Sequence, residues 1–395
     1  MKRGWRTEPL GALCDVVGGG TPSKGNPAFY SGEIPWATVR DMRQEVITET
    51  ECSITKEAVA SSATNIIPAG NVIIATRVGL GKVCLLGQDT AINQDLRGII
   101  PRDTKTLSVR FLYWWLRSMA GTIIAEGTGA TVQGVRLPFV KSLHVPLPPL
   151  AEQQRIVELL DNAFAGLTTA EAHAENNRRC AQAVFESKLQ SVFTRRGKGW
   201  IESTIGAEVR FIDYRGKTPV KTSNGIRLIT AKNVKMGYLQ ESPMEFIAAD
   251  SYESWMTRGI PKRGDVLFTT EAPLANVAQL DTDEKVAFAQ RIIIMQPNTA
   301  KLNSTFLKYL LISRPVQDRI RIKGTGATVQ GIKASLLKTV EISFPKNLSE
   351  QESIAGALSA LSVETMRLSL LYERKQAALV ALKQSLLHQA FAGNI

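Results

Sequence analysis

The chain has 395 residues, which is long enough for two or three domains with substantial cores. Its apolar content of 44% and charged content of 21% are ordinary for a globular protein. No stretch approaches the roughly 18 consecutive apolar residues that span a bilayer. The formal net charge of +12 divides into +3 for residues 1–195 and +9 for residues 196–395. A basic balance favours a nucleic-acid partner only modestly, because many basic proteins bind none.

The cysteines and histidines indicate neither disulfides nor a metal centre. None of the four cysteines belongs to a C-x-x-C pair, and the three histidines lie far apart in the sequence. Unpatterned thiols of this kind fit a reducing compartment. The basic start of the chain is not followed by an apolar run, so we expect no signal peptide and a cytoplasmic location. No metal ligands are expected.

The first 150 residues alternate turn signals with short apolar runs, which is typical of a mixed α/β domain. Turns are predicted at Gly18–Pro22 and Pro68–Asn71, strands at Val72–Ala75 and Val83–Leu86, and a short helix at Phe111–Met119. The proline-rich stretch Val145–Leu150 ends this region. Residues 197–348 repeat the pattern. Its predicted elements are a turn at Pro261–Asp265, strands at Val266–Phe268 and Ile292–Met295, and a helix at Phe306–Ile312.

Each of these regions is followed by a long helical pattern, from Glu152 to Phe193 and from Glu350 to Phe391. Apolar residues recur at heptad spacing in both. The predicted seam of the first helix is Ile156, Leu160, Ala163, Leu167, Ala170, Ala174, Ala181 and Val184. That of the second is Ile354, Leu358, Leu361, Thr365, Leu368, Tyr372, Lys375, Leu379, Leu382 and Leu386. About 40 residues at 1.5 Å each give helices of roughly 60 Å. We expect the two to pack antiparallel and to act as a ruler.

The two regions are copies of one module. Gly127–Gly134 reads GTGATVQG and recurs unchanged as Gly324–Gly331, an offset of 197. Other anchors return at offsets between 192 and 198, among them Gly4-Trp5, Thr21-Pro22, Phe111-Leu112 and Glu152-Gln153. Residues 43–67 and 235–259 share almost nothing. A common frame with a variable middle suits one task performed on two targets, and drift after duplication is the alternative.

The predicted fold class is therefore α+β. Two globular α/β domains are separated by two long antiparallel coiled-coil helices, with a pseudo-twofold internal repeat. The domain ranges are 1–150, 151–196, 197–348 and 349–395.

Motifs for catalysis and nucleotide binding are missing from the sequence. Gly216-Lys217-Thr218 resembles the end of a phosphate loop, but Phe211 stands where that loop needs glycine. In the octapeptides Val132 and Val329 replace the third glycine of a dinucleotide turn. The chain has no H-E-x-x-H and no G-x-S-x-G. It also lacks the Asn-Pro-Pro-aromatic or Asp-Pro-Pro-aromatic sequence with which amino-methyltransferases hold the target amine. We expect no catalytic residue and no cofactor bound by this chain.

The order of motifs resembles the specificity subunits of type I restriction-modification enzymes. The motifs that carry the resemblance are Gly18–Ser23, Ile34–Met42, Gly127–Gly134, Pro146–Ile156, Arg215–Pro219, Leu228–Val234, Gly324–Gly331, Glu350-Gln351 and Leu382–Phe391. They cover nearly the whole chain and occur in two sets. One departure is Leu348–Gln351, a weaker match than Leu150–Gln153, which leaves the start of the second helix less defined.

This resemblance implies a role. Each globular part would be a target recognition domain that reads one half of a bipartite, asymmetric sequence in double-stranded DNA. The helices would space the halves and dock two methyltransferase subunits, and motor-nuclease restriction subunits would join the full complex. S-adenosylmethionine, ATP and Mg would be bound by those partners, not by this chain. No membrane is involved. The alternative hypothesis is a stand-alone DNA-binding regulator or a protein scaffold built from a tandem repeat.

DNA contacts are predicted from polar residues in and around the variable segments, where Arg, Lys, Asn and Gln can reach phosphates or base edges. The candidates in the first half are Thr21, Ser23, Lys24, Thr38, Arg40, Arg43, Arg77, Lys82, Gln94 and Arg97. Those in the second half are Tyr214, Arg215, Lys217, Lys221, Thr230, Lys232, Lys235, Thr269, Gln290 and Arg291. Each could equally be a structural polar residue.

The repeated octapeptide adds four further candidates, Thr131, Gln133, Thr328 and Gln330. Because it is identical in both copies, it cannot distinguish two different half-sites. It could contact something common to both, such as phosphate or a methyltransferase subunit. A turn that supports the base of the helix is the alternative.

Overall fold

The computed structural model describes residues 5–129, 134–214, 218–326 and 330–395. The chain forms two compact units, one of residues 1–175 with 374–395 and one of residues 176–373. These units cut across the four sequential ranges, because each long helix contributes one end to each unit. We call the globular part of each unit its head, and each unit is described by itself.

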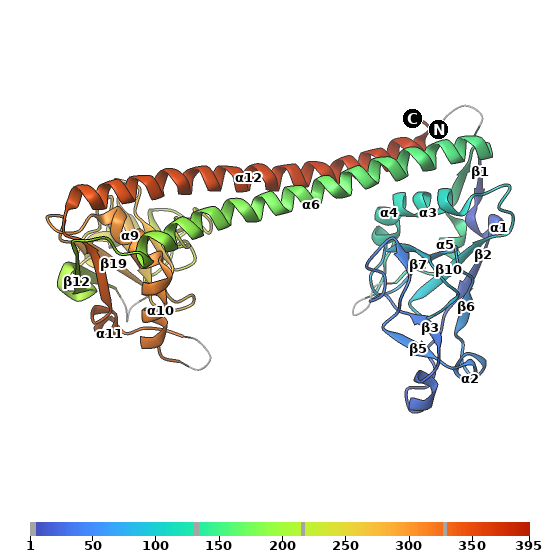
Figure 1. Ribbon diagram of the computed structural model, residues 1–395, viewed down its shortest axis with the longest axis horizontal. Helices are drawn as coiled ribbons and strands as arrows, with labels where there is room; N and C mark the ends of the chain where they lie inside the picture. The colour runs from blue at the N-terminus through green and yellow to red at the C-terminus, as the bar shows by residue number, and fades with distance from the viewer. Residues whose placement is uncertain (1–4, 130–133, 215–217, 327–329) are drawn as a thin grey trace. The chain divides into compact units, whose positions relative to one another are not determined.

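The first head contains eleven strands and five short α-helices among its described residues, in chain order (Figure 1). The elements are β1 (Arg6–Pro9), α1 (Leu10–Leu13), β2 (Cys14–Gly18), η1 (Pro27–Tyr30), β3 (Ile34–Ala37), β4 (Val46–Ile47), β5 (Cys52–Ile54), α2 (Lys56–Ala60), β6 (Asn65–Ile67), β7 (Val72–Ala75), β8 (Val83–Leu86), β9 (Thr90–Ile92), β10 (Leu96–Pro101), α3 (Val109–Ser118), α4 (Ala120–Ala125), α5 (Leu137–Ser142) and β11 (His144–Leu147). The long helix α6 (Leu150–Thr194) follows.

The second head repeats this order with fewer strands. Its elements are β12 (Trp200–Thr204), α7 (Ile205–Glu208), β13 (Val209–Asp213), β14 (Ile226–Ile229), β15 (Glu245–Ile247), η2 (Ala249–Ser251), α8 (Tyr252–Trp255), β16 (Val266–Thr269), β17 (Val277–Gln279), β18 (Val286–Phe288), β19 (Ile292–Pro297), α9 (Ser304–Ile312), α10 (Arg314–Lys323), α11 (Ala334–Lys338) and β20 (Glu341–Pro345). The second long helix is α12 (Leu348–Ala392).

The sheets have matching strand orders in the two heads. The first head has sheets β2-β10-β7-β8-β4 and β5-β3-β9-β6, and the second has β13-β19-β16-β17 and β15-β14-β18. A two-stranded antiparallel pair, β1–β11 or β12–β20, joins the start of each head to its end. Most pairings are antiparallel, but β3 pairs parallel with β9, β4 with β8, and β14 with β18. The predicted α+β class and the internal repeat are confirmed.

The predicted strands are buried on both faces. All four residues of β7 and of β16 are buried, as the unbroken apolar runs in their sequences require. The helices α3 and α9 are buried nearly all round for the same reason, since each lies between a sheet and the long helices. In the first unit Phe111 packs on Phe391 and Trp114 packs on Phe164. The head and the helix ends therefore share one core.

A buried glutamine fixes the start of each long helix. Gln153 accepts a bond from Ser108 N and donates to the carbonyls of Thr106 and Pro148. Gln351 does the same, accepting from Asn303 N and donating to the carbonyls of Lys301 and Pro345, at 2.7–2.9 Å. Both glutamines are completely buried. The weaker sequence match at Leu348–Gln351 thus hides an identical hydrogen-bond network.

The long helices pack antiparallel where their contacts lie within one unit. In the first unit Lys383 pairs with Glu171 at 2.5 Å, and Gln376 donates to Glu175 at 3.1 Å. Along these contacts the residue numbers in α6 decrease as those in α12 increase, so the two helices run antiparallel (Figure 1). In the second unit the end of α6 and the start of α12 share the core of the head.

The predicted seam is confirmed at all but three of its positions. Its buried positions are Ile156, Leu160, Ala174, Ala181, Leu358 and Thr365, and its half-buried positions are Ala163, Leu167, Ala170, Ile354, Leu361, Leu368, Tyr372, Leu379 and Leu386. Val184 is 53% exposed and Leu382 is 46% exposed. Lys375 is also exposed.

The register of the seam explains these three errors. In α6 the inward positions step by four from Ala181 to Phe185 and Leu189, which bypasses Val184. In α12 the inward positions are Gln376 and Lys383, one residue after those predicted. Two of the inward positions are therefore polar, and an apolar periodicity cannot find them.

One helix of the described residues, α12, is long and apolar enough by composition to cross a membrane, with an 18-residue window of mean hydropathy 1.3. Paired amphipathic helices can have the same composition. Here Lys383 and Gln376 face α6, which is unlike a lipid-facing span.

Candidate nucleic-acid interface

The candidate site of each head lies where two parallel strands end. The strands β3 and β9 run side by side, and the amide of Asn93 donates to the carbonyl of Ala37 at 3.0 Å. In the second head Ala289 N donates to the carbonyl of Ile229 at 2.9 Å beside β14 and β18. Since the carboxyl ends of parallel strands meet at one edge, the segments that follow them are neighbours. We call this the recognition edge.

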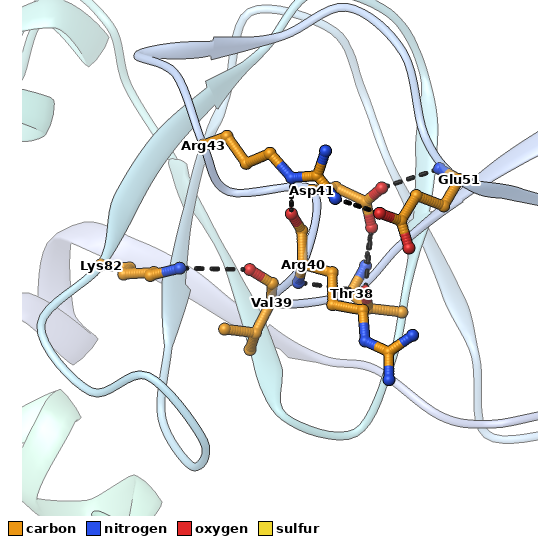
Figure 2. Close-up of polar contacts among 7 residues, drawn as sticks. All are labelled: Thr38, Val39, Arg40, Asp41, Arg43, Glu51 and Lys82. Carbon is orange, nitrogen blue, oxygen red and sulfur yellow. Dashed lines mark hydrogen bonds and ion pairs between the residues drawn. The ribbon is translucent and has the colours of Figure 1, made fainter. Parts of the chain in front are cut away.

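The first part of the recognition edge is the turn Thr38–Asp41 (Figure 2). Asp41 Oδ2 accepts from Thr38 N at 2.7 Å and from Thr38 Oγ1 at 2.9 Å, and Asp41 Oδ1 accepts from Glu51 N at 2.8 Å. Arg43 donates to the carbonyl of Arg40 at 2.8 Å and forms an ion pair with Glu51. Asp41 therefore fixes the turn rather than facing a ligand.

The second head builds the same turn from Thr230–Asn233. Asn233 Oδ1 accepts from Thr230 N at 3.0 Å and from Thr230 Oγ1 at 2.9 Å. The Asn233 amide then donates to the carbonyls of Gln240, Glu241 and Pro243. The side-chain oxygen of Asp and that of Asn perform one task here, because each can accept from the backbone two residues or more away. We call both segments the braced turns.

The second part of the edge is a threonine–glutamine pair. Thr21 Oγ1 donates to Gln94 Oε1, and in the second head Thr218 Oγ1 donates to Gln290 Oε1 at 2.5 Å. Gln94 follows β9 and Gln290 follows β18. The predicted Thr21, Gln94 and Gln290 are thus brought to the same edge as the braced turns.

A cavity of about 780 Å³ opens at the recognition edge of the first head. Its wall includes the aromatic pair Tyr30 and Trp36, with ring centroids 5.8 Å apart. Trp36 Nε1 and Thr64 Oγ1 both donate to the carbonyl of Gly20. A Cβ at Gly20 would lie 2.5 Å from the backbone of Ala63, so only glycine allows this close approach. The predicted candidates Thr21, Lys24, Thr38, Arg40 and Gln94 also line the cavity.

Several predicted cations are exposed but already have an acidic or carbonyl contact. The ion pairs are Arg43–Glu51, Arg77–Asp95, Lys221–Glu245 and Arg291–Glu271. Lys82 donates to the carbonyl of Val39 at 3.4 Å. Exposed ion pairs contribute about 0–1 kcal/mol, so these contacts hold the cations only weakly.

The candidates Ser23, Lys24, Arg40 and Lys232 are exposed, and Lys235 is half-buried. Within the described ranges no side-chain hydrogen bond or ion pair occupies Lys24, Arg40, Lys232 or Lys235. These four cations are available to an external anion or base edge.

Three predicted contacts in the second head are corrected by their burial. Tyr214 is 3% exposed, and its hydroxyl donates to Gly259 O and accepts from Arg258 N. Thr269 is fully buried and donates to Pro273 O, and Thr230 belongs to its braced turn. Polarity alone suggested these residues, whereas their hydrogen-bonding groups are used inside the fold. Burial also raises the pKa of Tyr214 above its ordinary value.

Two first-head candidates also have structural contacts. Thr38 belongs to its braced turn. Arg97 is half-buried and donates to the carbonyls of Gln94 and Leu96 at 3.0 and 2.7 Å. Burial and the nearby Arg77 lower the pKa of Arg97. Through these two bonds Arg97 holds the backbone of the loop that carries Gln94.

Thr131, Gln133, Arg215, Lys217 and Thr328 lie outside the described residues. Gln330 is described and exposed. Both octapeptides close in the same way, with paired backbone bonds between Thr128 and Gly134 and between Thr325 and Gly331. The residue after each loop donates to the backbone of a neighbouring strand end, Val135 N to Thr76 O and Ile332 N to Thr270 O.

Sequence reasoning missed the residues that hold the edge together, chiefly Asp41, Asn233 and Trp36. A usable signal existed, since Thr-x-Arg-Asp and Thr-x-Lys-Asn occupy the same position in the two copies. A polar side chain three residues after a threonine is typical of a side-chain-capped turn.

The buried cysteines and the acidic and histidine side chains of the described residues show neither a reactive thiolate nor a metal site. Burial raises the pKa of Cys14 to about 12 and that of Cys84 to about 11, so both thiols stay protonated at neutral pH. Across the described ranges, no three or more His, Cys, Asp or Glu side chains are grouped to hold a metal ion.

Comparison with known proteins places this geometry in a family. A family model described as the type I restriction modification DNA specificity domain matches residues 2–178 and 216–370. The specificity subunit of the Escherichia coli enzyme EcoR124I/EcoR124II is 37% identical over 173 residues, 42% of each chain. That of MjaIX from Methanocaldococcus jannaschii is 27% identical over 163 residues, 40% of this chain and 38% of the relative. The matched stretches thus span about two fifths of these curated relatives.

A solved structure from a study of complex assembly and conformational transition of the type I R-M system has a similar fold. It is 20% identical in sequence, with a TM-score of 0.79 over 100% of this chain and 99% of that chain. At that identity the likeness supports the fold alone.

Proposed function

Because the chain belongs to the family of type I restriction-modification DNA specificity domains, we propose that it is the non-catalytic subunit that selects the DNA target of a type I restriction-modification complex. Each head reads one half of a bipartite, asymmetric sequence in double-stranded DNA. The observation that carries this proposal is the recognition edge. Its braced turn and its threonine–glutamine pair are the same in both heads, whereas the surrounding segments 43–67 and 235–259 differ.

The chemistry of the edge suits duplex DNA. The available cations can neutralise phosphates, and guanidinium, ammonium and amide groups can pair with base edges in the major groove. The same backbone frame with different side chains gives two heads that dock alike and choose different bases. The target is then asymmetric although the protein is repeated.

The proposal extends to the assembly. The two long helices space the half-sites and dock two methyltransferase subunits, with motor-nuclease restriction subunits joining the full complex in the cytoplasm. S-adenosylmethionine, ATP and Mg are bound by those partners. This chain binds no cofactor and supplies sequence choice.

The test is co-expression of the full chain with its methyltransferase subunit, followed by sequencing of methylated adenines across the host genome. We expect one asymmetric target made of two separated parts, with one methylated adenine in each. A single-part or palindromic target would contradict two different reading heads. Stable DNA binding by the chain with no methylation in any combination would favour a stand-alone regulator.

A further inference from the structure

We propose that Arg40 and Lys232 are equivalent base-reading residues, each of which contacts a guanine in the half-site of its own head. This inference rests on the proposed function and assigns two residues to the reading step. Three observations carry it: the fixed backbone beneath each cation, the freedom of its charged group, and the carboxylates that surround Arg40.

Hydrogen bonds with Thr38, Arg43 and Lys82 hold the backbone that presents Arg40 (Figure 2). Its amide donates to Thr38 Oγ1 at 3.2 Å, and its carbonyl accepts from Arg43 Nε. The carbonyl before it, that of Val39, accepts from Lys82. The turn is further anchored by Met42, which is buried. A side chain on such a turn loses little backbone entropy when it binds, and that favours a geometrically exact contact.

Lys232 occupies the same place on the second braced turn. It precedes Asn233 as Arg40 precedes Asp41, and it is exposed. Val234, the counterpart of Met42, is completely buried, and its carbonyl accepts from Asn276 at 2.9 Å. The two heads therefore expose a cation at the same position of the braced turn, an arginine in the first head and a lysine in the second.

The charged groups of Arg40 and Lys232 are free to bind. No hydrogen bond or ion pair engages either group within the part of the chain that the structure describes. In contrast, Arg43 and Arg77 are paired with Glu51 and Asp95. The adjacent arginines thus support the edge, and Arg40 is left to face outward.

The surroundings of Arg40 favour a base edge over a phosphate. The cavity that it lines also contains Asp41, Glu51 and Asp95. A phosphate placed there would lie near three carboxylates, which repel it. A G·C pair presents the acceptors O6 and N7 of guanine together with the N4 amino donor of cytosine. Arginine complements the two guanine acceptors, and arginine or lysine to guanine is the commonest specific contact.

The test measures which bases each half-site requires. The full chain is assembled with its methyltransferase subunit, and methylated adenines are mapped for the wild type and for Arg40→Ala, Arg40→Lys and Lys232→Ala. The matched control is Lys105→Ala, an exposed cation on a turn of the first head. Salt dependence of duplex binding is measured in parallel.

We expect Arg40→Ala to lose the guanine requirement at one base pair of the first half-site only. Methylation of the original target should fall about tenfold or more. Arg40→Lys should keep the preference for guanine with weaker discrimination, because the ammonium lacks the two-pronged guanidinium. Lys232→Ala should relax one position of the second half-site only. Lys105→Ala should match the wild type.

Two results would overturn the inference. If Arg40→Ala weakens binding equally for all sequences and lowers the salt slope by about 0.9, Arg40 contacts a phosphate. If it changes neither sequence preference nor affinity, Arg40 makes no contact. A wild-type complex that methylates no bipartite site would instead refute the proposed function, whatever the variants do.

Discussion

The two heads have one frame and two surfaces. The frame consists of the strand order, the buried glutamine at the helix start, the braced turn and the threonine–glutamine pair. The surfaces differ: the first head adds β4 and β6 and an aromatic cavity, while the second carries most of the excess positive charge. The buried glutamines and the threonine contacts of the braced turns are the same in both heads, whereas the solvent-facing side chains differ. Under the proposed function, duplication has preserved the positioning of a reader and changed what it reads.

The largest expected effect on stability comes from replacing the buried glutamine at the start of either long helix. Gln153→Leu leaves Ser108 N and the carbonyls of Thr106 and Pro148 buried without a bond, and Gln351→Leu does the same in the second head. Each unsatisfied buried group costs about 1–3 kcal/mol, so we expect a loss of roughly 3 kcal/mol or more in either variant. Hydrogen–deuterium exchange at the amides of Ser108 and Asn303 reports it.

The exposed neighbour Gln154 provides the control, and Gln154→Leu should leave both amides protected. Equal effects of Gln153→Leu and Gln351→Leu would support an equivalent frame. A large loss in one head and none in the other would show that the frames differ in energy despite their geometry.

The two heads also differ in the polar contacts that attach each head to the long helix that follows it. In the first unit Asp161 accepts three bonds from the Arg110 guanidinium and one from Trp114 Nε1 at 2.7 Å. In the second unit Tyr309 donates to Ser359 at 3.2 Å. We expect Asp161→Ala to cost about 2 kcal/mol and Ser359→Ala less than about 1 kcal/mol. Denaturant unfolding monitored by tryptophan fluorescence gives both values, and a reversed order would contradict the account.

The polar positions in the helix pair should respond differently to single and double changes. Lys383→Leu leaves Glu171 half-buried without its cation, and we expect a loss of about 1–2 kcal/mol. The double variant Glu171→Leu with Lys383→Leu should recover most of that loss, because the seam becomes apolar. Thermal unfolding of the three variants measures the coupling. Additive losses would mean that the two side chains do not interact.

The smallest expected effect is a pH dependence confined to the second head. Burial raises the pKa of Asp265, whose Oδ2 accepts from both Lys262 N and Gln296 Nε2. Because the folded-state pKa lies above the unfolded value near 3.9, this group favours folding most at pH below that value. That contribution is lost as the pH rises through the folded-state pKa.

The first head has Asn71 at the corresponding turn, so Asp265→Asn is the natural substitution. An amide oxygen can keep both bonds that end on Oδ2. We expect the variant to lose this acid-range dependence and to be at least as stable as the wild type at pH 7. Unfolding midpoints between pH 3 and pH 7 check it, and unchanged slopes would contradict the role given to Asp265.

The elements that were predicted correctly are those marked by apolar runs or by a periodic apolar pattern in the sequence. The strands β7, β8, β16 and β19 and the helix α9 lie where apolar runs placed them, and the long helices begin and end within two residues of expectation. A run of buried residues leaves a direct trace in the sequence, because each position must be apolar.

The recognition edge was only partly predictable, because it depends on contacts between distant segments. Nothing local distinguishes the buried Thr269 from the exposed Lys232 as a DNA contact. The inward positions of Gln376 and Lys383 were also hidden, since a polar pair satisfies the helix seam there. Tertiary hydrogen bonding decides these cases, and a single sequence does not display it.

The central claim is that each head reads its own half-site. It is tested most directly by replacing residues 1–150 with the corresponding head of another family member and sequencing the methylated adenines. The account predicts a new first half joined to an unchanged second half. A target that changes in both halves, or in neither, would contradict it.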